Sequence, residues 1–295
     1  MIQPVIPRRS LLFVPASNTR ALEKARGLSA DGIIIDLEDA VAPTMKEAAR
    51  ERAEAAIAVG FGGRTIALRI NDPDTPQGES DLKAALRCLP EAIVLPKVSH
   101  PDTIRKVSRR LDEAGAPPAL RIWAMIETAR AVLNADAIAS SAQDPENRLD
   151  LLIIGANDLA RETRVKPAPD RAPLLPWLQH VLLAARANDL DIIDSVYNDF
   201  ADADGFTAEC RQGRTLGFDG KTLIHPAQIG PANTAFGPSP EEVGDAHAMI
   251  AAFSAPENAN LGAVSYKGRM IEELHIVMAR RTVALSEAIA KLHET

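Results

Sequence analysis

Cysteine and aromatic residues are scarce in this chain of 295 residues. The sequence holds two cysteines, and aromatic residues make up 4% of it. Cys88 and Cys210 lie far apart and form no CxxC motif, so neither a disulfide framework nor a thiolate metal site is expected. A core poor in aromatics and rich in Ala, Leu, Ile and Val is typical of parallel strands that are covered by helices.

Long runs of one kind of residue are also missing. The formal net charge is -7 and no basic run appears, so nucleic-acid binding has no electrostatic support. No apolar stretch approaches the roughly 20 residues that a membrane span needs. The apolar run Leu11–Val14 is too short for the core of a signal peptide. We therefore expect a cytoplasmic protein that has neither a nucleic-acid nor a membrane partner.

Short apolar runs alternate with helical patterns along most of the chain. The runs are Leu11–Val14, Gly32–Ile35, Thr65–Arg69, Ala92–Leu95, Ile122–Ile126, Leu149–Ile154, Asp191–Ile193 and Gly220–Ile224. They lack the polar alternation of half-exposed strands, which predicts strands buried on both faces. Eight strands alternating with helices predict an α/β fold of the (β/α)8 TIM barrel type. An open doubly wound sheet is the alternative, but the usual glycine-rich dinucleotide loop does not follow the first run.

The end of the chain exceeds what a barrel needs. We predict a barrel over residues 1–236, and over residues 237–295 a C-terminal helical extension that acts as an arm or a lid. Pro226–Gly237 is rich in proline and glycine and is interpreted as a connector. Asn258–Gly268 is small and polar, which favours a flexible loop. The stretches on either side of that loop, Pro240–Phe253 and Met270–Leu292, are predicted to be helices.

Polar residues follow nearly every predicted strand. In a barrel of this kind the active site lies at the carboxyl ends of the strands, so these residues should meet at one rim. The acids among them are Asp36, Glu38, Asp39, Glu127 and Asp158, and the other polar residues include Arg69, Lys97, Tyr197 and His225.

Five carboxylates at one rim would repel one another strongly at low dielectric. A hard divalent cation would offset that repulsion, and Mg²⁺ typically takes one or two carboxylates. Glu127 and Asp158, from adjacent strands, fit that habit. The alternative is that these acids cap helices or pair with lysines.

The remaining rim residues allow two interpretations each. Asp36 or Glu38 is better explained as an anchor for a metal-bound water or for Lys97 than as a direct ligand. Arg69 could form an ion pair with these acids, and its fork-shaped guanidinium could also donate hydrogen bonds to a carboxylate or an oxyanion. His225 is as well explained by a structural role as by a catalytic one.

A set of segments in fixed order carries a more specific pattern. They are RSLLFVPA (9–16), IIIDLEDAV (33–41), LRIN (68–71), VLPKV (94–98), MIETARAV (125–132), GANDLA (155–160), SVYNDF (195–200) and GFDGKTLIHPAQI (217–229). Together they resemble the citrate lyase β-subunit and malyl-CoA lyase family of the aldolase superfamily, from about Arg9 to Met270.

That resemblance implies a Mg²⁺-dependent carbon–carbon lyase. The enzyme would cleave a 3-hydroxyacyl-CoA thioester, of the malyl-, citramalyl- or citryl-CoA type, into acetyl-CoA and a 2-oxo acid by retro-Claisen chemistry. A homo-oligomer, a trimer or a hexamer, is also implied.

The resemblance also assigns roles by motif. The implied metal ligands are Glu127 and Asp158; the implied catalytic residues are Arg69, Glu272, Glu38 and Asp36; the implied substrate-binding residues are Arg69, Glu127, Asp39, Lys97, Tyr197 and His225. Arg69 would stabilise the enolate. Glu272, delivered from a neighbouring subunit, would carry a proton.

Two positions depart from the family pattern. Asn157 stands where relatives commonly have Glu, and Glu272 stands where many CoA lyases of the family have Asp. Three other functions also remain open. They are a malyl-CoA thioesterase, a β-subunit of a citrate lyase complex that acts on an acyl carrier protein, and a relative without catalytic activity.

Overall fold

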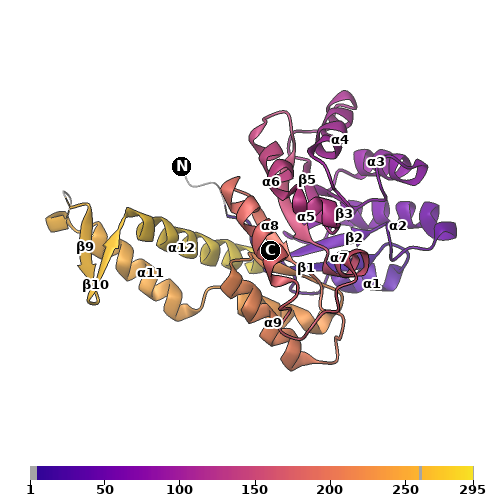
Figure 1. Ribbon diagram of the computed structural model, residues 1–295. Helices are drawn as coiled ribbons and strands as arrows, with labels where there is room; N and C mark the ends of the chain where they lie inside the picture. Colours follow the sequence, from indigo (N-terminus) through magenta and orange to yellow (C-terminus); the bar gives the residue numbers. More distant parts are fainter. Residues whose placement is uncertain (1–4, 259–260, 295) are drawn as a thin grey trace. The chain divides into compact units, whose positions relative to one another are not determined.

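The computed structural model describes residues 5–258 and 261–294. Its parallel strands close into a barrel in chain order, with β8 pairing back to β1 (Figure 1). The strands are β1 (Ser10–Pro15), β2 (Gly32–Asp36), β3 (Thr65–Arg69), β4 (Ala92–Leu95), β5 (Arg121–Ile126), β6 (Leu149–Ile154), β7 (Asp191–Asp194) and β8 (Gly220–Leu223). The predicted (β/α)8 barrel is confirmed, and the β1–β8 pairing excludes the open sheet.

Helices follow the strands and cover the outside of the barrel (Figure 1). They are α1 (Thr19–Ala25), α2 (Lys46–Val59), α3 (Pro76–Cys88), α4 (Pro101–Glu113), α5 (Ala129–Leu133), α6 (Ala135–Ser140), α7 (Ala156–Thr163), α8 (Leu175–Ala187), α9 (Ala203–Leu216) and α10 (Ile229–Phe236). Inside the barrel, alternate residues such as Leu11, Ile34, Trp123 and Ile153 form a buried cluster. These side chains fill the barrel as a packed core, which leaves the carboxyl ends of the strands as its open rim.

Helix α10 corrects the prediction of a connector over Pro226–Gly237. The segment contains a 3-10 turn at Pro226–Gln228 followed by α10. Pro231 lies in the first turn of the helix, where its missing N–H is not needed. Ile229 and Ala232 are buried at helical spacing. The proline and glycine content hid this apolar spacing.

The chain divides into two compact units. The barrel unit is Arg8–Ala235, and the C-terminal unit joins Met1–Pro7 to Phe236–Thr295. Helices α11 (Pro240–Phe253) and α12 (Glu273–Glu294) of the C-terminal unit pack side by side, with the hairpin β9 (Ala263–Tyr266) and β10 (Arg269–Glu272) at their end (Figure 1).

This hairpin corrects the prediction of a flexible loop over Asn258–Gly268, of which residues 259–260 lie outside the described residues. Lys267 and Gly268 have φ angles of 48° and 76°, as a two-residue turn with positive φ at both positions requires. Val264 and Ile271 pair across the strands and are buried in the core of this unit. The predicted helix Met270–Leu292 therefore begins later, at Glu273.

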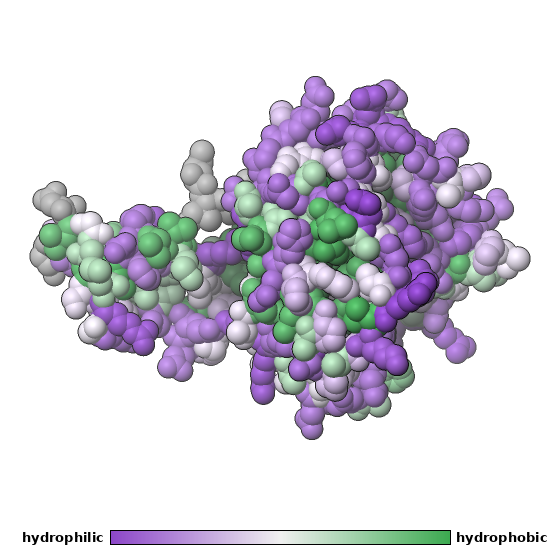
Figure 2. All heavy atoms as spheres, viewed as in Figure 1, coloured by the Kyte–Doolittle hydropathy of each residue, from purple (hydrophilic) through white to green (hydrophobic). Residues whose placement is uncertain are grey.

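Apolar side chains also remain on the surface of the C-terminal unit. Met270, Leu274, Val277 and Met278 are exposed, the last three at helical spacing on α12. Figure 2 shows several apolar side chains on the visible face of this unit. In the described part of the chain, no helix is both long and apolar enough to cross a membrane.

A buried charge network supports the rim at β7 and β8. Arg171 Nη1 donates to both carboxylate oxygens of Asp194, at 2.8 and 2.7 Å, and Lys221 Nζ donates to Asp194 Oδ2 at 3.0 Å. Burial alone would raise the pKa of Asp194, but Lys221 and Arg171 outweigh it and lower the pKa. The Thr222 hydroxyl donates to the Asp194 carbonyl oxygen at 3.0 Å, so the network also fixes a residue of the rim.

We predict that Asp194→Asn destabilises the protein by about 3–5 kcal/mol, because it leaves two buried cations without their common anion. The measurement is chemical denaturation at neutral pH. The exposed pair Glu79–Lys83 on α3 provides the control, since Glu79→Gln breaks an ion pair that water screens. Equal losses in the two variants would contradict the assignment of Asp194 as a structural anchor.

Candidate active site

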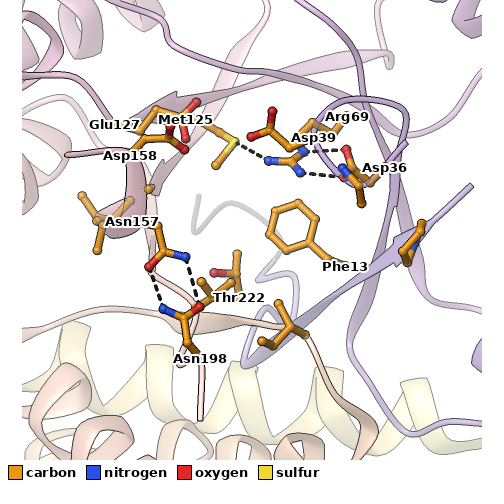
Figure 3. A pocket seen from close by; sticks show the side chains of 17 residues that line it. Phe13, Asp36, Asp39, Arg69, Met125, Glu127, Asn157, Asp158, Asn198 and Thr222 are labelled. Atoms are coloured by element: carbon orange, nitrogen blue, oxygen red, sulfur yellow. Dashed lines mark hydrogen bonds and ion pairs between the residues drawn. The ribbon is translucent and has the colours of Figure 1, made fainter. Parts of the chain in front are cut away.

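A cavity of about 400 Å³ opens at the carboxyl ends of the strands (Figure 3). It is lined by Phe13, Pro15, Asp36, Asp39, Ala40, Arg69, Met125, Glu127, Ile154, Gly155, Ala156, Asn157, Asp158, Val196, Asn198, Thr222 and Ile224. Five residues selected from the sequence therefore line one cavity: Asp36, Asp39, Arg69, Glu127 and Asp158. All of them lie in the barrel unit.

Arg69 is fixed in the cavity wall by a two-pronged ion pair. Asp36 and Arg69 lie opposite each other in the β2–β3 register, and Arg69 donates from Nε and Nη2 to the two carboxylate oxygens of Asp36, at 2.6 Å each. The guanidinium also stacks 4.7 Å from the centre of the Phe13 ring. Burial opposes its charge, but Asp36 and then Glu38 raise the pKa of Arg69. Arg69 thus stays charged and presents a fixed donor to the cavity.

Glu38 and Lys97 lie outside the cavity lining and support it from behind. Lys97 Nζ donates to Glu38 Oε1, and Arg69 Nη1 lies 3.1 Å from Glu38 Oε2 in an ion pair without hydrogen-bond alignment. Burial raises the pKa of Glu38, and the two cations offset part of that rise. Glu38 therefore contacts the site through Arg69, and Lys97 contacts it through Glu38 and through its own backbone N–H to Glu127, while neither residue lines the cavity.

Glu127 is the buried carboxylate of the cavity. Its Oε1 accepts the Lys97 backbone N–H at 2.7 Å, which Lys97 aims by adopting a left-handed φ of 52°. Burial, with smaller contributions from Glu38 and Asp158, raises the pKa of Glu127 to about 7. Gly155 makes room for this side chain, because an added Cβ would lie 2.4 Å from Glu127 Oε2.

Asp158 lies beside Glu127 in the first turn of α7 (Figure 3). It also forms an ion pair with the exposed Arg161, one turn further along. Within residues 5–258 and 261–294, no three His, Cys, Asp or Glu side chains come together as a metal-binding group. Two hard carboxylates facing a cavity nevertheless match the donor set of Mg²⁺, which keeps several waters and needs only one or two carboxylates. The residues present therefore fit that ion.

Two asparagines form the wall below Asp158 (Figure 3). Asn157 Nδ2 donates to Asn198 Oδ1 at 3.1 Å, and Asn198 Nδ2 donates to Asn157 Oδ1 at 2.8 Å. Asn198 follows β7, and its position after a strand is the signal by which it could have been found from the sequence. Phe13 and Met125 were missed as well, because apolar residues inside strands carry no signal of function.

Three further sequence-selected residues lie outside this cavity. The Tyr197 hydroxyl donates to Asp202 at 2.6 Å. His225 stacks on Phe200, with ring centres 4.8 Å apart, and its Nδ1 accepts the Ala227 N–H at 3.2 Å. Glu272 ends β10 in the C-terminal unit, where its backbone N–H donates to His275 Nδ1 at 3.0 Å.

The cavity combines two groups that can take part in chemistry with a neutral wall. A fixed guanidinium offers hydrogen bonds to an oxygen on which negative charge develops. Two neighbouring carboxylates can hold a divalent cation. Neutral amides form the opposing wall.

Comparison with known proteins agrees with these features. Residues 9–226 match the HpcH/HpaI aldolase/citrate lyase family. The chain is 47% identical over 285 residues to the (3S)-malyl-CoA thioesterase of Cereibacter sphaeroides, with 96% of each chain covered. It is 31% identical to the human mitochondrial citramalyl-CoA lyase, with 96% of this chain and 87% of that protein covered.

A solved structure extends the comparison to the fold. CitE of Mycobacterium tuberculosis, in complex with magnesium, acetoacetate and coenzyme A, is similar with a TM-score of 0.74 and 26% identity. The alignment covers 94% of this chain and 97% of CitE.

We predict that Glu127→Gln stabilises the metal-free protein increasingly as the pH rises. A carboxyl whose pKa is about 7 when folded, against 4.5 as its ordinary value, stabilises the fold below pH 4.5 and loses that contribution as the pH rises toward 7. Glutamine keeps the acceptor for Lys97 and does not ionise. Denaturation with a chelator present should show the variant gaining up to about 3 kcal/mol on wild type between about pH 5 and about pH 8. A difference that is constant over this range would contradict the raised pKa.

Proposed function

The chain belongs to the HpcH/HpaI aldolase/citrate lyase family, and from that membership and the cavity we propose a Mg²⁺-dependent enzyme that acts on a hydroxyacyl-CoA thioester of the malyl-CoA class. The observation that carries the proposal is the fixed Arg69 guanidinium in the same cavity as the Glu127 and Asp158 carboxylates. Magnesium in the CitE complex and malyl-CoA in the name of the 47% relative support it.

We propose thioester hydrolysis as the reaction. The 47% identity to a malyl-CoA thioesterase, over 96% of both chains, favours it over the carbon–carbon cleavage that the sequence analysis placed first. Water adds to the thioester carbonyl carbon, the carbon–sulfur bond breaks, and the sulfur takes a proton. The products are a free hydroxy acid and coenzyme A.

The residues of the cavity have separate roles in this reaction. Glu127 and Asp158 would hold Mg²⁺, which would supply Lewis-acid polarisation of the oxygens of the acyl group. Arg69 donates to the carbonyl oxygen as it gains negative charge, and Asp36 keeps the guanidinium oriented. Asp39, in the same wall, contacts the acyl group. Glu38 and Lys97 hold Arg69 and Glu127 in place.

Carbon–carbon cleavage is the second candidate, supported by the 31% identity to a citramalyl-CoA lyase. In that reaction the hydroxyl loses its proton, the bond to the carbon next to the thioester breaks, and the resulting enolate takes up a proton. Arg69 would serve both reactions, because each develops negative charge on the thioester oxygen.

Product analysis with malyl-CoA separates the two candidates. We expect free malate and coenzyme A in the presence of Mg²⁺, almost no turnover with a chelator, and almost none in Glu127→Gln. Glu54→Gln, which changes an exposed ion pair with Arg87 on the outer helices, should retain wild-type activity. Glyoxylate and acetyl-CoA as products would identify the lyase instead. No reaction with a free CoA ester would favour an acyl-carrier substrate.

We also propose a homo-oligomer, a trimer or a hexamer, in which Glu272 reaches the cavity of a neighbouring subunit and carries a proton. The exposed apolar side chains of the C-terminal unit support such an assembly, because Met270, Leu274 and Met278 would be buried in it. Tyr197 and His225 follow β7 and β8 outside the cavity and are proposed to contact the coenzyme A portion.

Mixed oligomers test the position of Glu272. Arg69→Lys and Glu272→Gln should each be nearly inactive alone. Unfolded together and reassembled at equal amounts, they should recover about a quarter of the wild-type activity, because some sites then combine an intact Arg69 with an intact Glu272 from another subunit. Wild-type protein taken through the same procedure is the control for reassembly. No recovery, with mixed oligomers verified by mass, would show that Glu272 does not act across subunits.

A further inference from the structure

The first turn of α7 is held on both sides of Asp158. On one side, the Gly155 N–H donates to the Ile126 carbonyl oxygen at 3.1 Å, and the Glu127 side chain packs against Gly155. On the other side, the reciprocal hydrogen bonds of Asn157 and Asn198 tie this turn to the loop after β7 (Figure 3). Asp158 comes directly after Asn157, so its backbone position follows from both attachments.

The loop that carries Asn198 is itself anchored. Gln228 Nε2 donates to the Tyr197 carbonyl oxygen at 2.9 Å. Gln228 Oε1 accepts the backbone N–H groups of Ile224 and His225, at 3.0 and 3.2 Å. Asn198 therefore connects the first turn of α7 to a loop whose backbone is already held by Gln228, just after β8.

The exposure of this amide pair indicates a local role. Asn157 and Asn198 are both exposed, and hydrogen bonds that compete with water contribute little to global stability. Asp158 has a competing partner in the exposed Arg161, at the next turn of the same helix. Asp158 already pairs with Arg161 through Oδ1, so a first turn that could tilt would carry the Asp158 carboxylate, with its Arg161 partner, away from Glu127.

We propose that Asn157 and Asn198 form an amide latch whose function is to position Asp158 for metal binding. This inference rests on the proposed metal site at Glu127 and Asp158. Both asparagines are positioning residues: the latch keeps the two carboxylates converged before the cation arrives, so that less ordering is needed on binding. Because both side chains are amides, the latch adds no negative charge beside the two acids.

A double-mutant cycle on Mg²⁺ affinity tests the latch. Asn157→Ala and Asn198→Ala should each weaken Mg²⁺ binding, measured by calorimetric titration of the full chain, about tenfold. Because either change opens the same pair of hydrogen bonds, the double variant should also be only about tenfold weaker. The midpoint of thermal unfolding should change little in all three.

Asn233→Ala is the matched control. Asn233 also makes two hydrogen bonds, accepting from Ser10 Oγ at 2.6 Å and donating to the Ser29 carbonyl oxygen at 2.8 Å, but at the opposite end of β1 from the cavity. It should leave Mg²⁺ affinity unchanged.

The possible failures are distinguishable. Glu127→Gln should weaken Mg²⁺ binding strongly. If it does not, the proposed metal site is wrong, and the proposed role of the amide latch is overturned as well. If Glu127→Gln weakens binding but the two asparagine variants bind Mg²⁺ like wild type, only the latch is overturned. A roughly hundredfold loss in the double variant would show two independent residues, and would overturn the latch in the same way.

Discussion

The accumulation of carboxylates at the rim of the barrel is the constraint on which the site depends. Asp36, Glu38 and Glu127 are buried within a few residues of the strand ends, and Asp158 lies beside Glu127. Arg69 neutralises Asp36 through two hydrogen bonds and lies against Glu38. Glu127 accepts the backbone N–H of Lys97, which follows the preceding strand β4, and burial outweighs this hydrogen bond and raises the pKa of Glu127. The unbalanced charge is therefore concentrated where a cation would be bound.

The cavity has two walls with different properties. The wall from β2 and β3 holds charged groups locked together, so the Arg69 donor is in place before any substrate arrives. The wall from β6 and β7 is built from neutral amides and a helix first turn, held by hydrogen bonds that water can replace. The two hydrogen bonds to Asp36 thus fix the donor at Arg69, where charge would develop in the proposed reaction. The amide wall is the part of the cavity that small substitutions can change without loss of the fold.

Some features of the fold and of the cavity could be predicted from the sequence, and others could not. The strand runs were short but mostly apolar and lacked polar alternation, so eight strands and their closure could be predicted, together with five of the residues that line the cavity. Gly230 and Pro231 are typical of connectors, so the prediction of a connector overlooked the apolar residues at helical spacing that form α10. The β9–β10 hairpin depends on positive φ at Lys267, which residue type does not reveal. Glu38 pairs with Lys97, as the interpretation of an anchor expected, but the order of residues along a strand does not tell which side chains face the cavity and which pack behind it.

The sequence by itself determined the barrel, the identity of the charged residues at its rim and the resemblance to a family, because hydrophobic periodicity and motif order are local properties of the chain. Only the tertiary structure decided which partners those charges have. Pairing of Asp36 with Arg69, the burial that raises the pKa of Glu127, and the meeting of Asn157 with Asn198 each join residues far apart in sequence. Such contacts depend on the register of neighbouring strands and on the paths of the loops between them, which no local pattern encodes.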